Sequence, residues 1–116
     1  MLPNRIKFSQ KATDKLRYMK TRTGLTPNIL ARIAIMLTLK EKGSLSNAGV
    51  SDSDGQELNN SVLFGEHIHV YDVMIHQYIH DNKIDLPIHR AISAMVEVGL
   101  HKMGHVKQVE DLCEFI

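Results

Sequence analysis

The alternation of polar and apolar residues near the start of the chain predicts a short β-strand from Arg5 to Ser9. Ile6 and Phe8 fall on the side expected to face a core. Arg5, Lys7 and Ser9 fall on the side expected to face solvent. A lone strand leaves backbone hydrogen-bonding groups unsatisfied and needs a partner. Because no later segment is a clear mate, we expect a second copy of the chain to supply the second strand.

Two amphipathic helices are predicted directly after this strand. The first begins at Ser9, a good N-cap, and ends at Gly24, which tolerates a positive φ; its apolar stripe consists of Ala12, Leu16 and Met19. The second begins at Thr26 as N-cap with Pro27 in the first helical position, and extends to about Lys42 before Gly43. The residues expected on its broad apolar face are Ile29, Leu30, Ile33, Ala34, Met36 and Leu37.

The rest of the chain is predicted to be a loop followed by helices. Residues 43–61 are rich in Gly, Ser, Asn and Asp and are interpreted as a loop. Helices are expected over about 66–82 and about 87–103, with a last short helix in the tail. The residues expected to be buried by these helices are Ile68, Tyr71, Ile75, Tyr78 and Ile79, and then Ile88, Ile92, Met95, Val96 and Gly99.

The resulting fold class is mainly α: a short N-terminal strand plus two helices, resembling a ribbon-helix-helix, followed by additional helices packed in the same domain. The 116 residues suit a single domain with a basic part (1–42), a loop (43–61) and an acidic helical part (62–116). Aromatic residues make up only 5% and there is no Trp, which favours helix packing over a large sheet sandwich.

The net charge of +1 conceals a strong asymmetry between the two ends of the chain. Residues 1–42 contain ten Lys or Arg and two acidic residues, whereas residues 43–116 contain four Lys or Arg and eleven acidic residues. Such a division indicates a polyanionic partner for the basic part. The alternative is that the two parts neutralise each other across an interface.

The order strand, helix, tight turn, helix also predicts where DNA would bind. The N-terminus of the second helix, Thr26-Pro27-Asn28-Ile29, presents free backbone N–H groups to a phosphate, with Lys20 and Arg22 just upstream. Lys11, Lys15 and Arg22 share one side of the first helix, and Arg17 and Lys20 lie off it. The expected DNA-binding residues are Arg5, Lys7, Lys11, Lys15, Arg17, Lys20, Arg22, Thr26 and Asn28.

Other classes of function receive little support from the sequence. The single cysteine, Cys113, forms no intramolecular disulfide, and no signal peptide or membrane-spanning stretch is recognisable, so a cytoplasmic protein is expected. No catalytic motif is present, and we predict neither an enzyme nor a cofactor. The pairs His76 with His80 and His101 with His105 have the spacing of zinc ligands but lack further ligands, so no metal site is predicted.

The opening LPNRIKFSQKATDKLRYMKTRTGLTPNILARIAIMLTL is similar to the DndE family of the bacterial DNA phosphorothioation (sulfur modification) system. The most distinctive piece is TGLTPNILARIA, residues 23–34, and the likeness extends to LHKMGHVKQVEDL near the end. The resemblance implies a non-catalytic subunit that binds duplex DNA, nicked duplex in particular, through surface lysines. It also implies a homotetramer, and partners that replace a non-bridging phosphate oxygen by sulfur.

Three functions are therefore distinguished. The leading hypothesis is a DNA-binding subunit of the sulfur modification complex that engages the phosphate backbone with little base readout. The alternatives are a ribbon-helix-helix repressor that reads sequence through its strand, and a structural scaffold whose basic and acidic parts serve self-assembly. A metal-dependent enzyme would have only the histidine pairs in its favour.

Overall fold

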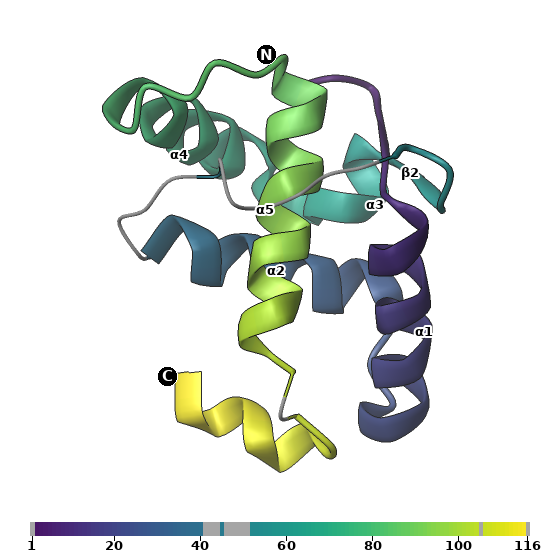
Figure 1. Cartoon of the computed structure of the whole chain (residues 1–116). Helices are drawn as coiled ribbons and strands as arrows, with labels where there is room; N and C mark the ends of the chain where they lie inside the picture. Colours follow the sequence, from purple (N-terminus) through teal and green to yellow (C-terminus); the bar gives the residue numbers. More distant parts are fainter. Residues whose placement is uncertain (1, 41–44, 46–51, 105, 116) are drawn as a thin grey trace.

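The computed structural model describes residues 2–40, 45, 52–104 and 106–115, and within them the protein is mainly α, as predicted (Figure 1). Helix α5 crosses the face of α2 at the centre of the molecule, with α1 and α4 on opposite sides of that crossing. The elements in chain order are β1 (Arg5–Lys7), α1 (Gln10–Thr23), α2 (Pro27–Lys40), β2 (Glu57–Asn59), α3 (Asn60–Phe64), the 3-10 helix η2 (Gly65–His67), α4 (Ile68–Asp81), α5 (Ile88–Lys102) and the 3-10 helix η3 (Val109–Phe115).

The prediction that a second copy of the chain supplies the partner of the first strand is wrong. β1 pairs antiparallel with β2 of the same chain, with Ile6 opposite Leu58. The ladder continues past the strands, because Phe8 N–H donates to the Gln56 carbonyl (2.9 Å) and Gly55 N–H donates to the Phe8 carbonyl (2.9 Å). The partner was overlooked because it lies within residues 43–61, a stretch whose composition is typical of a loop.

The capping residues of α1 have the predicted roles. The Ser9 side chain accepts a hydrogen bond from Ala12 N–H (3.1 Å), and Gly24 closes the helix with φ 77°. Ile6 and Phe8 are fully buried, as expected, but the solvent-facing position predicted for Ser9 is wrong. Ser9 is buried because β1 ends before it, at Lys7, and its side chain turns back onto the first turn of α1.

Helix α2 begins at Pro27 as predicted, but its buried face is not the one expected. Leu30, Ala34 and Leu37 are buried, whereas Ile29 and Met36 are exposed. The buried side also includes Ala31, Ile35 and Thr38, so the stripe is rotated from the predicted one. The expected end of the helix, at Lys42 and Gly43, lies outside the described residues.

The interpretation of residues 43–61 as a loop is also wrong at its C-terminal end. Residues 57–59 form β2, and Asn59 caps the short helix α3 by accepting a hydrogen bond from Val62 N–H (3.0 Å). Most of the preceding part of this stretch lies outside the described residues. Residues 52–56 lead into β2 and run beside the start of α1.

Helices α4 and α5 lie close to the ranges predicted from the hydrophobic periodicity. Helix α4 buries Tyr71, Ile75 and Tyr78, and the tail forms the predicted short helix, η3. Helix α5 buries Ile92, Met95, Val96 and Gly99 against the core. Ile68, Ile79 and Ile88 are only partly buried. No helix in the described ranges is long and apolar enough to cross a membrane.

Helices α2 and α5 approach each other closely at Gly99. A Cβ atom added there would lie 2.0 Å from the Ala34 carbonyl oxygen and 2.4 Å from the Ala34 Cα. Only a residue without a side chain allows the two backbones to come this close. The crossing fixes α2, and therefore the turn that joins it to α1, the helix that carries most of the predicted site.

Candidate nucleic-acid interface

Helix α1 carries its basic residues on two flanks and not on one face. At 3.6 residues per turn, Lys11, Lys15 and Arg22 fall along one flank, and Arg17 and Lys20 fall along the other. Lys15 is half-buried and the other four are exposed. The structure thus keeps the grouping read from the sequence, but it does not gather all these cations on one surface.

The first flank also contains an aromatic residue. Lys11, Lys15, Tyr18 and Arg22 are spaced at i, i+4, i+7 and i+11, and we call these four residues the Tyr18 flank. The Arg22 guanidinium carbon lies 5.3 Å from the centre of the Tyr18 ring. Tyr18 was not predicted as a site residue, although its i+7 spacing from Lys11 places it on the same stripe.

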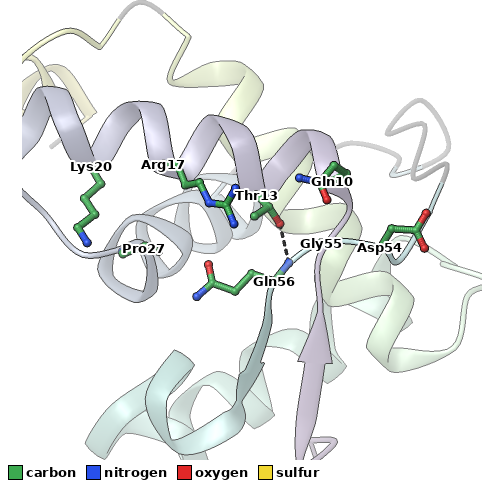
Figure 2. Close-up of a pocket in the computed structure, with 8 residues that line it drawn as sticks. All are labelled: Gln10, Thr13, Arg17, Lys20, Pro27, Asp54, Gly55 and Gln56. Carbon is green, nitrogen blue, oxygen red and sulfur yellow. Dashed lines mark hydrogen bonds between the residues drawn. The ribbon is translucent and has the colours of Figure 1, made fainter.

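The second flank opens into a groove of about 440 Å³. Arg17 and Lys20 project from α1 into it, and Gln56 projects toward them from the segment that precedes β2 (Figure 2). Pro27, the first residue of α2, forms part of the wall. The remaining lining residues are Gln10, Thr13, Asp54 and Gly55, and we call the whole set the α1–α2 groove.

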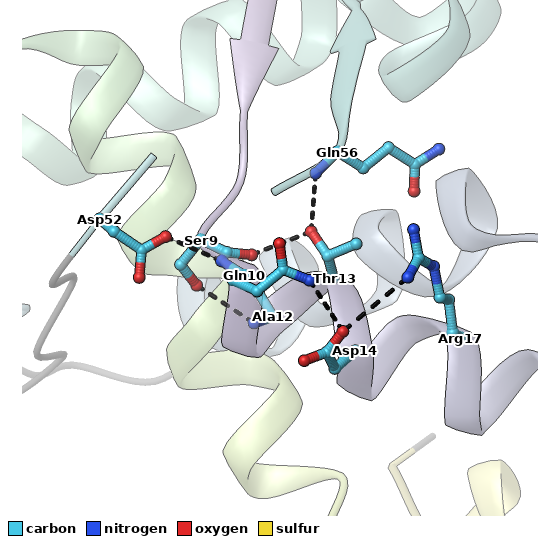
Figure 3. A network of polar contacts seen from close by, with 8 residues as sticks. All are labelled: Ser9, Gln10, Ala12, Thr13, Asp14, Arg17, Asp52 and Gln56. Carbon is cyan, nitrogen blue, oxygen red and sulfur yellow. Dashed lines mark hydrogen bonds and ion pairs between the residues drawn. The ribbon is translucent and has the colours of Figure 1, made fainter. Parts of the chain in front are cut away.

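The groove exists because the backbone of residues 52–56 lies tightly against the start of α1. A Cβ atom on Gly55 would lie 2.1 Å from Thr13 Oγ1 and 2.4 Å from the Ser9 carbonyl oxygen, so a glycine is required there. The Asp52 carboxylate accepts a hydrogen bond from Gln10 N–H (2.9 Å), which also ties the segment to the helix N-terminus (Figure 3).

The N-terminus of α2 meets only part of the prediction made for it. Pro27 lines the groove beside Lys20, so a cation from α1 does lie near this helix end. Thr26 is exposed, but the Asn28 side chain is half-buried and its amide donates to the Val62 carbonyl of α3 (3.4 Å). Asn28 is therefore turned toward the protein, and Arg22 is not among the groove residues.

The two cations of β1 are exposed but lie close to a carboxylate. Arg5 forms an ion pair with Glu57 (3.6 Å), and Lys7 is the register partner of the same Glu57. Opposite charges on paired strands attract each other, so the Glu57 carboxylate partly neutralises the positive charge of β1.

Within the described ranges, the acidic part of the chain forms no ion pair with the cations of α1. Arg17 lies 3.9 Å from Asp14, one turn away on the same helix, and both side chains are largely exposed. Such exposed pairs are worth about 0–1 kcal/mol and open readily to a stronger anion. For Lys11, Lys15, Lys20 and Arg22, the described residues offer no carboxylate within ion-pair distance.

One basic residue of α2 has a structural role that sequence reasoning did not identify. The half-buried Arg32 donates hydrogen bonds to the carbonyls of Val62 (2.9 Å) and Leu63, and so satisfies the C-terminal end of α3. Gly65 permits this approach, since a Cβ there would lie 2.9 Å from the Arg32 guanidinium. Arg32 is therefore engaged within the fold and adds little to the basic surface.

The histidine pairs do not assemble a metal site in the described part of the chain. No three His, Cys, Asp or Glu residues there are placed to hold a metal ion. His76 instead contacts Asp72 on the preceding turn, with Nδ1 2.8 Å from the carboxylate. His105 lies outside the described residues.

The chain matches the family model of the DNA sulphur modification protein DndE over residues 5–111. The crystal structure of DndE from Escherichia coli B7A, involved in DNA phosphorothioation modification, is similar with a TM-score of 0.74 and 27% identity, covering 89% of this chain and 98% of that one. The crystal structure of a DndE mutant involved in DNA phosphorothioation has a TM-score of 0.71 and 26% identity, with 89% and 99% covered. No curated protein sequence matches the chain.

Proposed function

Because the chain belongs to the DndE family of DNA sulphur modification proteins, we propose that it is a non-catalytic DNA-binding subunit of the bacterial phosphorothioation machinery, acting in the cytoplasm. One observation carries the DNA-binding part of the proposal. Helix α1 carries three exposed cations, Lys11, Lys20 and Arg22, and the half-buried Lys15 on its two flanks, and none of the four has a carboxylate partner among the described residues. A polyanion is the ligand whose charge these side chains complement.

The mechanism is electrostatic engagement of the phosphate backbone, with little base readout. An α-helix with its side chains is about 10–12 Å across, and the major groove of B-DNA is about 12 Å wide. Cations on both flanks of α1 could therefore contact phosphates on the two sides of a groove. Each phosphate neutralised releases condensed counterions, so affinity falls steeply as salt rises.

Neither alternative function gains a specific observation in its favour. A ribbon-helix-helix repressor builds its DNA-reading ribbon from the strands of two chains, whereas β1 pairs with β2 of its own chain. A scaffold that neutralises itself needs ion pairs between its basic and acidic parts. Arg5 with Glu57 is such a pair, but the exposed lysines of α1 have none among the described residues.

The proposal also includes two kinds of assembly. The chain forms a homotetramer, and it binds the other components of the sulfur modification complex. Helix α4 presents an exposed apolar stripe of Val70, Val73 and Met74, on the other side of the α2–α5 crossing from α1 (Figure 1). Apolar surface of this kind is typical of protein contacts, and its position would leave α1 free for DNA. Sedimentation of the purified protein measures the number of copies.

A charge-matched pair of variants tests the DNA-binding proposal. The triple variant Lys11→Gln, Lys15→Gln, Lys20→Gln should bind a duplex oligonucleotide at least about 100-fold more weakly at moderate salt, because three phosphate contacts are lost. The control Lys83→Gln, Arg90→Gln, Lys107→Gln removes three exposed cations from the acidic part and should bind like the wild type. Thermal unfolding of both variants checks that the fold survives.

Two outcomes would reject the proposal. One is a wild-type protein that fails to shift any duplex in a gel at moderate salt. The other is an equal loss of affinity in the two triple variants, which would mean that only net charge matters and that α1 is not the binding surface.

A further inference from the structure

Tyr18 differs from the other aromatic residues whose side chains the structure describes. The described aromatic side chains are Phe8, Tyr18, Phe64, Tyr71 and Tyr78, and four of these are buried with at most 8% exposed. Tyr18 is 48% exposed on the solvent side of α1. Its ring takes no part in the core, so burial does not explain an aromatic residue at this position.

The neighbours of Tyr18 are cations along the same flank. Lys11 and Lys15 precede it and Arg22 follows one turn later, with its guanidinium 5.3 Å from the ring centre. This contact holds a planar cation against one face of the ring. Tyr18 is exposed to solvent despite this contact, so a second flat group can approach its ring.

We infer that Tyr18 stacks on an unpaired base of DNA, and that the Tyr18 flank gives the protein a preference for DNA with unpaired bases over fully paired duplex. The inference rests on the proposed DNA-binding function and specifies the form of DNA that this flank recognises. Cations that track the backbone beside an aromatic ring that stacks on a base are the usual means of binding single strands.

The dimensions of the flank suit this ligand. Lys11 and Arg22 are eleven residues apart in α1, which corresponds to about 16 Å along the helix axis at 1.5 Å per residue. A B-form strand advances about 3.4 Å per nucleotide, so the flank covers about five nucleotides. In intact duplex the base faces are covered by their neighbours, whereas a gap or a single strand leaves a face free for Tyr18.

Binding of three DNA probes by the full chain tests the inference. The probes are an intact duplex, the same duplex with a short gap, and the unpaired strand alone, measured by fluorescence anisotropy at one salt concentration. Tyr18→Ala should weaken binding to the gapped and single-stranded probes about ten- to hundredfold, with little change for the intact duplex. Tyr18→Phe keeps the ring and should bind all three like the wild type.

Tyr18→Leu separates stacking from simple apolar contact. It should lose affinity as Tyr18→Ala does, because a leucine side chain offers no flat surface to a base. Tyr18 is exposed, so the three variants should unfold at the wild-type temperature. If all variants match the wild type on every probe while the wild type still binds duplex, the role of Tyr18 is overturned and the proposed function stands. If the wild type binds none of the probes, the proposed function itself fails.

Discussion

The hydroxyl of Thr13 joins the first helix to Gln56, which lies 43 residues later in the chain and directly precedes β2. Its oxygen accepts a hydrogen bond from Gln56 N–H (2.8 Å) and donates its proton to the Ser9 carbonyl (2.9 Å) (Figure 3). The Ser9 carbonyl also accepts a hydrogen bond from Thr13 N–H (3.0 Å), so it is Gln56 N–H that depends on the buried Thr13 hydroxyl. The same contact holds Gln56 at the wall of the α1–α2 groove.

Replacing Thr13 by Val should therefore destabilise the protein by about 1–3 kcal/mol, because Gln56 N–H loses its buried acceptor. Thr13→Ser retains the hydroxyl and should recover most of that loss. Thr21→Val is a matched control, since the Thr21 hydroxyl is exposed and donates to the Arg17 carbonyl of its own helix (3.1 Å). Urea unfolding measures all three, and equal midpoints for Thr13→Val and Thr21→Val would contradict the role assigned to Thr13.

The close contact between Gly99 and Ala34 leads to a second prediction about stability. Gly99→Ala introduces a Cβ 2.0 Å from a backbone oxygen, so α2 and α5 must move apart. Overpacking of a core costs about 1–3 kcal/mol and sometimes more, and backbone has little room to yield here. Gly104→Ala provides the comparison, because its Cβ would lie 3.2 Å from the nearest atom. A melting temperature for Gly99→Ala equal to that of Gly104→Ala would show that the helices are not in close contact.

Most of the helical fold could be predicted because each helix carries its own local signals. Ser9 and Gly24 mark the two ends of α1, and Pro27 marks the start of α2. The 3.6-residue hydrophobic period identifies Ile75 of α4 and Ile92 of α5 as buried. These signals involve neighbours within one or two turns. They do not depend on the tertiary arrangement, so the sequence alone reveals them.

The pairing of β1 with β2 could not be predicted, because residues 57–59 form a strand only through their tertiary contacts with β1. Glu57-Leu58-Asn59 has no alternation strong enough to identify a strand, and it becomes one because Ile6 and Leu58 meet across the ladder. The same limit applies to the site. The spacing of Arg17 and Lys20 is visible in the sequence, but the arrival of Gly55 and Gln56 beside them is not.

Two buried tyrosines predict a loss of stability at high pH. Burial raises the pKa of Tyr78 above the ordinary 10.0, and it does the same for Tyr71, although the nearby Arg32 cation acts in the opposite direction there. Above about pH 10 the unfolded chain therefore releases phenolic protons that the folded chain keeps. The unfolded state is favoured as pH rises, so the contribution of these two tyrosines to stability should be constant below this range and fall above it.

The variant Tyr71→Phe, Tyr78→Phe tests this pH dependence. Urea midpoints at about pH 8 and about pH 11 give the change in stability for the variant and for the wild type. Any effect of the missing hydroxyls on packing is present at both pH values, so it cancels in the change of stability between them. The variant should lose less stability than the wild type between them, and an equal loss would exclude the tyrosines as the cause.

The α1–α2 groove and the Tyr18 flank make separate predictions about the path of DNA. Arg17→Gln with Lys20→Gln, and Lys11→Gln with Lys15→Gln, each remove two cations, one pair from each flank of α1. If phosphates lie on both sides of the helix, each pair should reduce the slope of log affinity against log salt by about 2. Asp54→Asn removes a carboxylate from the groove wall and should tighten binding several-fold through that flank alone. Fluorescence anisotropy with duplex over a salt series measures the three variants. If the slope changes for only one pair of variants, the DNA lies on that flank alone. If that pair is Lys11 and Lys15, Asp54→Asn should not change the affinity, and tighter binding by Asp54→Asn would contradict this path.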